Sequence, residues 1–142
     1  FNPSIMTAAA QGGNVPAMQW IKDHCPPLAA SSIWEFKAAV RAAESGHVPA
    51  LSWLMEQEYF RPCPNRRRAY GIVLCAAART GQAAVFVWVR DESSPWRGDD
   101  HPMGLAAAGG HLSTVLVLME LGCEATSNSV LNAIRGGHIL VL

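Results

Sequence analysis

The sequence lacks the motifs that identify most enzymes and membrane proteins. Its 142 residues contain no phosphate-binding loop, no dinucleotide-binding glycine fingerprint and no G-x-S-x-G turn. The cysteines Cys25, Cys63, Cys75 and Cys123 form no C-x-x-C pair, and none has a histidine partner in a nucleophile motif. The longest apolar stretch is too short to span a bilayer. We therefore expect no enzyme activity, no cofactor and no insertion into a membrane.

An excess of charge of either sign is also missing. Eleven lysines and arginines balance eleven aspartates and glutamates, so the formal net charge is +0. Nucleic-acid-binding domains usually carry a basic surplus, so this composition does not favour a nucleic-acid partner. Scattered cysteines are typical of a reduced, intracellular protein, and we expect that location without a specified compartment. His24–Cys25 and Asp99–His101 each lack a second pair of zinc ligands, so no metal site is predicted.

What the sequence does have is a repeating pattern. Glycines recur at Gly13, Gly46, Gly81, Gly110 and Gly137, at intervals of 33, 35, 29 and 27 residues. Alanines stand three and four residues before almost every one of them, and further apolar residues, most of them larger than alanine, stand seven before and two, five and eight after. These steps of three and four place the apolar residues on one face of each of two helices. We predict one array with repeats at about 4–31, 32–64, 65–98, 99–126 and an incomplete 127–142.

Two columns of this pattern could be mistaken for ligand-binding sites. His47, His111 and His138 each follow a repeat glycine, where Asn14 and Gln82 stand in the other copies. A position that accepts His, Asn or Gln requires a hydrogen-bonding side chain at a turn, so we predict a structural role. A second column holds Trp20, Trp53 and Trp88, which we expect to pack between neighbouring second helices. Pro16 and Pro49 are expected in the first turns of second helices.

Residues 100–123 resemble the ankyrin repeat family, whose motif is T-P-L-H-x-A-A-x-x-G-H. The matching residues are Pro102, Met103, Ala106, Ala107, Gly110 and His111. Gly46 and His47 match in the second copy, whereas His101 and Gly104 depart from the family pattern and the first three copies lack its opening. The resemblance implies an all-α fold, a solenoid of stacked helix–loop–helix repeats. Because the last copy breaks off at Leu142 within an apolar run, we expect either a longer array or ends buried against other protein.

Stacked repeats leave connector loops and the open face of the first helices free, which predicts a non-catalytic protein–protein interaction module. As the resemblance implies, the contacts would come from the following residues: Tyr59, Phe60, Arg66, Arg67, Arg68, Trp96, Arg97, Asp99 and Asp100. Within this set Trp96 fits either loop packing or an interface anchor. The three arginines fit a solvated face, an acidic protein partner or RNA phosphate.

Two alternatives of other classes remain open. The apolar ends and the degenerate repeat openings also fit a structural scaffold subunit permanently embedded in a large multiprotein assembly. A helical repeat that binds RNA is the third interpretation, and it predicts an affinity that falls steeply with added salt.

Overall fold

The computed structural model describes residues 3–25, 33–57, 66–91 and 100–138, and these residues form helices and turns without a strand. The helices are α1 (Pro3–Gln11), α2 (Val15–His24), α3 (Ile33–Glu44), α4 (Val48–Met55), α5 (Arg66–Thr80), α6 (Ala83–Asp91), α7 (Asp100–Ala108), α8 (Leu112–Glu120) and α9 (Ser127–Arg135). The predicted all-α class is therefore confirmed for the described part of the chain.

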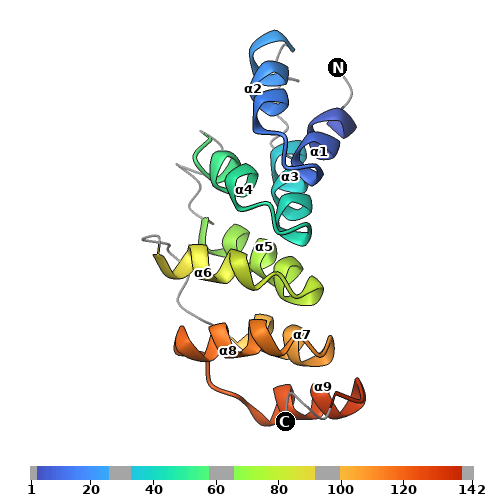
Figure 1. Ribbon diagram of the computed structural model, residues 1–142, viewed down its shortest axis with the longest axis vertical. Helices are drawn as coiled ribbons and strands as arrows, with labels where there is room; N and C mark the ends of the chain where they lie inside the picture. The colour runs from blue at the N-terminus through green and yellow to red at the C-terminus, as the bar shows by residue number, and fades with distance from the viewer. Residues whose placement is uncertain (1–2, 26–32, 58–65, 92–99, 139–142) are drawn as a thin grey trace.

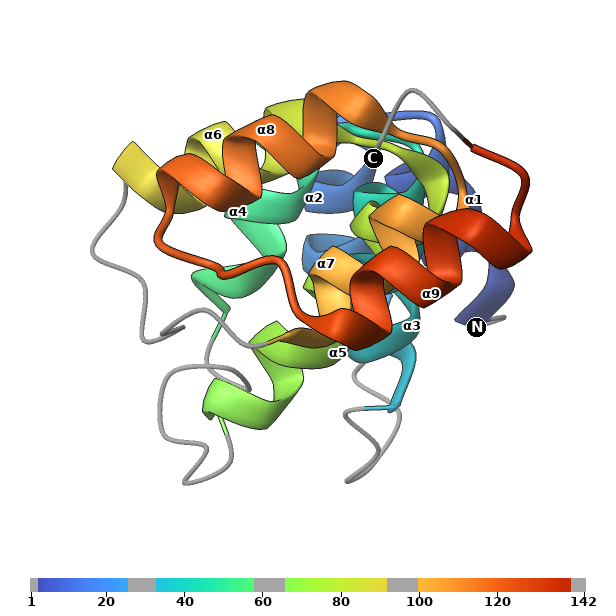
Figure 2. The same cartoon turned by 90° about the horizontal axis from the view of Figure 1, so that it is seen from below.

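Eight of the helices form antiparallel pairs that follow one another along the long axis of the molecule (Figure 1). The first helices, α1, α3, α5, α7 and α9, each contact the next first helix in the series. The second helices, α2, α4, α6 and α8, do the same on the other side. The end-on view in Figure 2 shows these two rows as two layers. None of the described helices is both long enough and apolar enough to cross a membrane.

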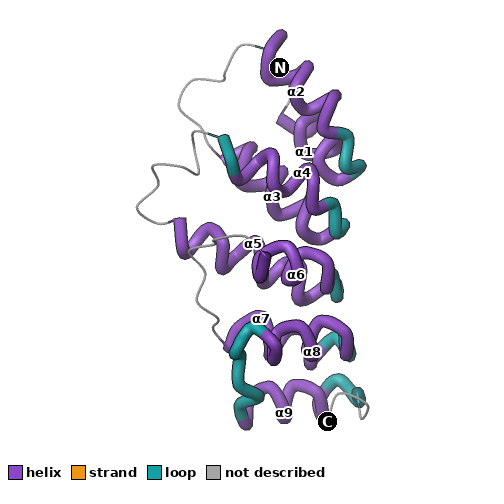
Figure 3. The backbone as a smooth tube through the Cα atoms, turned by 60° about the vertical axis from the view of Figure 1, so that its left-hand side comes forward, coloured by secondary structure: helices purple, strands orange, loops and turns teal. Residues whose placement is uncertain are grey.

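Each pair is closed by a tight turn, and Figure 3 shows these turns along one edge of the stack. The five repeat glycines take positive φ values between 68° and 76°, a conformation in which other residues are strained. The amide of the residue after each glycine donates to the carbonyl oxygen five residues before it, as His111 N does to Ala106 O at 2.9 Å. This is the Schellman type of helix ending. The glycine pattern therefore marks the helix ends, as the sequence indicated.

The core lies between the two layers and follows the predicted columns. In the first helices it consists mainly of alanines, with larger buried residues such as Met6, Leu74 and Met103, each at most 1% exposed. In the second helices Met18, Leu51, Phe86 and Val115 form one buried column and Ile21, Leu54, Val89 and Leu118 the other. Because alanine has a small side chain, the first helices approach one another closely. Pro16 and Pro49 lie in the first turns of α2 and α4, as predicted.

The tryptophan column needs a correction. Trp53 and Trp88 are half-buried and pack against the core, and the Trp53 indole N–H donates to Gln19 Oε1 at 3.1 Å. Trp20 is instead 59% exposed and stacks on His24, with ring centroids 4.6 Å apart. No described helix precedes α2 in its row, so no described second helix covers this indole from that side. The prediction that Trp20 packs between second helices is wrong.

Candidate functional site

Most of the predicted contact residues cannot be placed. Tyr59, Phe60, Trp96, Arg97 and Asp99 lie outside the described residues. Arg66, Arg67 and Arg68 are the first residues of α5 and Asp100 is the first residue of α7, but their side chains are not among those described. The prediction for these connector and arginine residues therefore stays a prediction. What the structure does describe is the other half of the predicted surface, the outward face of the first helices.

The side chains that follow the repeat glycines join one turn to the turn before it. The Gln82 amide nitrogen donates to Glu44 O at 2.9 Å. The His111 ring lies 3.0 Å from Arg79 O through Nε2, and since a carbonyl only accepts, Nε2 carries the proton in this contact. The structural role predicted for His111 and Gln82 is therefore confirmed.

The rings of His47 and His138 fill the corresponding spaces. A Cβ added at Gly13 would lie 2.7 Å from His47 Nδ1, and one added at Gly110 would lie 2.5 Å from His138 Nδ1. The glycines thus serve two purposes, since they adopt positive φ and leave room for the next copy's side chain. The described residues also contain no group of three or more His, Cys, Asp or Glu side chains that could hold a metal ion.

The outward side of the first helices carries a row of polar and basic side chains, which we call the open face. Its residues are spaced three and four apart on α3 and α9 and seven apart on α5, opposite the buried alanines, and all are exposed or half-buried. They are Lys37, Arg41 and Glu44 of α3, Ile72 and Arg79 of α5, and Asn128, Asn132 and Arg135 of α9. This spacing follows the helical period, so each residue belongs to one continuous side of the first-helix layer.

One ion-pair network crosses the open face from α3 to α5. The Glu44 carboxylate lies 2.9 Å from Arg41 Nη1 and 2.8 Å from Arg79 Nη2. The Glu44 side chain is 17% exposed, whereas those of Arg41 and Arg79 are 55% and 64% exposed. Such exposed pairs contribute at most about 1 kcal/mol each and weaken with salt. Their main consequence is a fixed position for two guanidinium groups at the surface.

The two layers differ in the sign of their charges. Among the described side chains of the first helices, four cations (Lys37, Arg41, Arg79 and Arg135) outnumber two anions (Glu35 and Glu44). The described side chains of the second helices and their caps include Lys22 and Arg90 against Asp23, Glu56 and Glu120. The neutral chain is therefore basic on its first-helix layer and slightly acidic on the other. Net charge alone does not reveal this separation.

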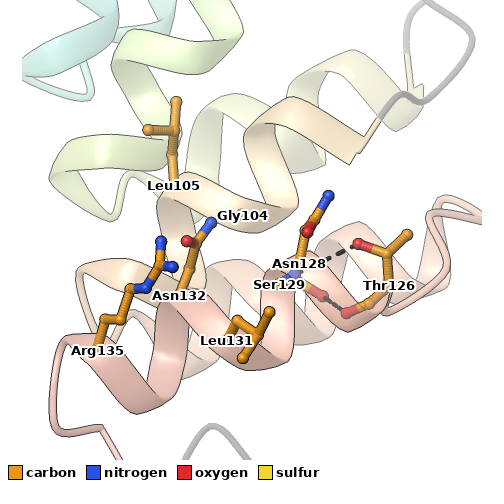
Figure 4. Close-up of a pocket in the computed structure, with 8 residues that line it drawn as sticks. All are labelled: Gly104, Leu105, Thr126, Asn128, Ser129, Leu131, Asn132 and Arg135. Carbon is orange, nitrogen blue, oxygen red and sulfur yellow. Dashed lines mark hydrogen bonds between the residues drawn. The ribbon is translucent and has the colours of Figure 1, made fainter.

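A pocket of about 290 Å³ opens on this face between α7 and α9 (Figure 4). Its lining consists of Gly104 and Leu105 from α7 and Thr126, Asn128, Ser129, Leu131, Asn132 and Arg135 from α9 and its N-cap. At the position of Gly104 the three earlier copies carry Thr7, Val40 and Cys75. A Cβ at Gly104 would lie 3.0 Å from Asn132 Nδ2. Because glycine has no side chain, the Asn132 carboxamide can occupy this space.

The polar groups of the pocket fall into two sets. The Thr126 and Ser129 hydroxyls are used in the cap of α9, where Thr126 Oγ1 accepts from Ser129 N at 3.3 Å and Ser129 Oγ donates to Thr126 O at 2.7 Å. The side chains of Asn128, Asn132 and Arg135 make no hydrogen bond or ion pair with any other described residue. Sequence reasoning missed these three residues. Their polar character at positions four and three apart on one helix side was the available signal.

No known family model matches the sequence, and no curated protein is significantly similar to it.

Proposed function

We propose that this chain is an array of ankyrin-like repeats that acts as a non-catalytic protein–protein interaction module, with its open face as the contact surface for an acidic partner. The observation that carries the proposal is the separation of charge between the layers, with Lys37, Arg41, Arg79 and Arg135 on the open face. A basic surface on a neutral protein is a local feature, and it favours encounter with partners of negative potential.

The turn geometry supports the repeat assignment within this proposal. Five turns share one backbone conformation, and in four of the copies the residue after the glycine packs against the turn of the preceding copy. In a stack built this way each repeat contacts only its neighbours, and the outward sides of the first helices form one extended surface. The family resemblance of residues 100–123 points in the same direction.

A matched pair of variants tests the surface. Lys37→Ala with Arg41→Ala removes one lysine and one ion-paired arginine from the open face. Lys22→Ala with Arg90→Ala removes the same two kinds of residue from the second helices, where Arg90 pairs with Glu120 at 3.1 Å. We expect co-purification from the native source, read by quantitative mass spectrometry, to lose the partner with the first variant and retain it with the second. Equal recovery with both variants would overturn the proposed surface.

A structural scaffold subunit is the second candidate, and exposed apolar side chains favour it. Leu112, Leu116 and Met119 line one side of α8, and Val130 and Ile134 lie on α9, each between 41% and 57% exposed. Apolar surface of this kind is typical of permanent interfaces. Sedimentation velocity decides between the two, because a chain that stays monomeric and soluble at high concentration does not need permanent partners. RNA binding, the third interpretation, predicts a steep loss of affinity between low and high salt.

A further inference from the structure

The α7–α9 pocket contains an arginine whose guanidinium group has no carboxylate partner among the described residues. Among the four arginines whose side chains are described, Arg41 and Arg79 pair with Glu44, and Arg90 pairs with Glu120. Arg135 has no carboxylate among the described residues, and its guanidinium borders the pocket. A planar guanidinium offers two parallel N–H donors, the geometry that a carboxylate accepts.

The groups next to Arg135 extend this recognition. Asn132 and Asn128 project from the same side of α9 as Arg135 and toward α7, as Figure 4 shows. Each carboxamide has a donor and an acceptor, and this pair can satisfy the main-chain N–H and C=O groups of a peptide. Leu105 and Leu131 supply the aliphatic part of the lining. One pocket therefore combines a cation, two main-chain-like amides and an apolar surface.

We propose that this pocket binds an acidic side chain, glutamate or aspartate, together with an adjacent aliphatic side chain of an extended segment in a protein partner. This inference rests on the proposed function, because it names the chemistry by which one part of the open face would recognise its partner. The pocket volume of about 290 Å³ lies at the lower limit of small-molecule sites, and it suits one or two side chains better than a cofactor.

A carboxylate fits the charge of the pocket better than a phosphate. A phosphorylated side chain carries a charge of about −1.5 to −2 and is usually held by a cluster of arginines. Arg135 is the one cation among the described residues of the lining, so the charge of a single carboxylate is sufficient to neutralise it. Binding of a phosphorylated side chain is therefore treated as an alternative outcome of the test.

The test uses short peptides and the whole 142-residue chain. The probes are acetylated, amidated hexapeptides in which a Glu–Leu or Leu–Glu pair is flanked by glycine and serine. Binding is followed in ¹⁵N–¹H correlation spectra, including the side-chain amides of Asn128 and Asn132 and the Arg135 Nε–H group. We expect saturable shifts confined to α7 and α9. Replacing the glutamate of the probe by glutamine should weaken binding about tenfold, the worth of a hydrogen bond to a charged group.

The variants locate the effect. Arg135→Ala should weaken binding of the glutamate probe about tenfold and leave binding of the glutamine probe unchanged. The affinity of Arg135→Lys for the glutamate probe should lie between those of wild type and Arg135→Ala, because lysine keeps the charge but lacks the two parallel N–H donors of the guanidinium. Arg90→Ala, on the other layer, is the matched control and should change neither affinity. Four results would each overturn the assignment. They are unchanged binding of the glutamate probe to Arg135→Ala, tighter binding of a phosphoserine probe, tighter binding of a peptide with a free C-terminal carboxylate, and the absence of any shift.

The two proposals fail separately. If no peptide binds the pocket but Lys37→Ala with Arg41→Ala still abolishes partner recovery, the carboxylate pocket is wrong and the interaction surface stands. If the peptide binds as expected and the open-face variant keeps its partner, the pocket chemistry stands and the wider contact surface is wrong.

Discussion

Equivalent positions in α7 and α9 have very different surroundings. Met103 of α7 is 1% exposed, whereas Val130, at the same place relative to its repeat glycine, is 42% exposed. Ala107 is 2% exposed, and its counterpart Ile134 is 57% exposed. The pattern of the two helices is the same, but α7 has α5, α8 and α9 packed against it, whereas α9 packs mainly against α7 among the described helices. Burial in this fold is therefore contributed by the neighbouring helices.

The largest expected effect separates a buried position from its exposed counterpart. Leu74→Ala, at the fully buried position of α5 that corresponds to Val130, should lower the free energy of unfolding by about 2–5 kcal/mol, because it removes core contacts and leaves a cavity. Val130→Ala should lower it by about 0.5 kcal/mol or less, as at other exposed sites. Urea unfolding followed by circular dichroism measures both. Equal losses would mean that Val130 is buried in solution and that the contrast between the helices is false.

A smaller effect separates two glycine turns of the same conformation. Gly110 and Gly137 have φ values of 71° and 72°, but an added Cβ meets His138 only at Gly110. Gly137→Ala should lose about 1–2 kcal/mol through the left-handed conformation alone. Gly110→Ala should lose a further 1–3 kcal/mol, roughly, through the clash with the imidazole.

The double variant Gly110→Ala with His138→Ala is the control for this turn. Removing the ring should abolish the additional loss. Thermal unfolding of the wild type, Gly110→Ala, His138→Ala and the double variant gives the coupling between the two positions directly. Additive losses would show that the close approach of His138 is not the cause.

The smallest effect concerns two arginines of the open face. Arg79→Ala removes an ion pair with Glu44 and should lower the unfolding free energy by up to about 1 kcal/mol in low salt and by less in high salt. Arg135 has no such partner among the described residues, so Arg135→Ala should leave stability unchanged at either salt concentration. Unfolding curves at two ionic strengths measure this difference. A salt-dependent loss in Arg135→Ala would indicate a structural ion pair and would weaken the case for a binding role.

Much of the fold could be predicted because its determinants are local. A glycine at positive φ, an alanine pair three and four residues earlier in four of the five copies and a hydrogen-bonding residue after it specify each helix end within one short segment. The helical class and the hydrogen-bonding role of His111 and Gln82 follow from this pattern and are confirmed. The ankyrin-like assignment and the function remain proposals.

The site could be predicted only in part, because it depends on residues that are distant in the sequence. The sequence predicted that the first helices present an open face, but no residue of α9 was among the predicted contact residues. The pocket arises where Gly104 of α7 meets Asn132 of α9, and the sequence does not show that these two residues are close. The exposure of Trp20 was missed for a related reason. Its place in the tryptophan column predicts packing against a neighbouring second helix, but that packing requires a second helix before α2.

The sequence by itself determined where the helices end and which residues share a face, because both depend on contacts within a few residues of the chain. The tertiary structure alone decided which of the equivalent apolar side chains are buried, which arginines find a glutamate, and where the first-helix layer is hollow. Those outcomes depend on atoms that belong to different helices, such as Arg79 and Glu44, and they are set by how closely the helices pack.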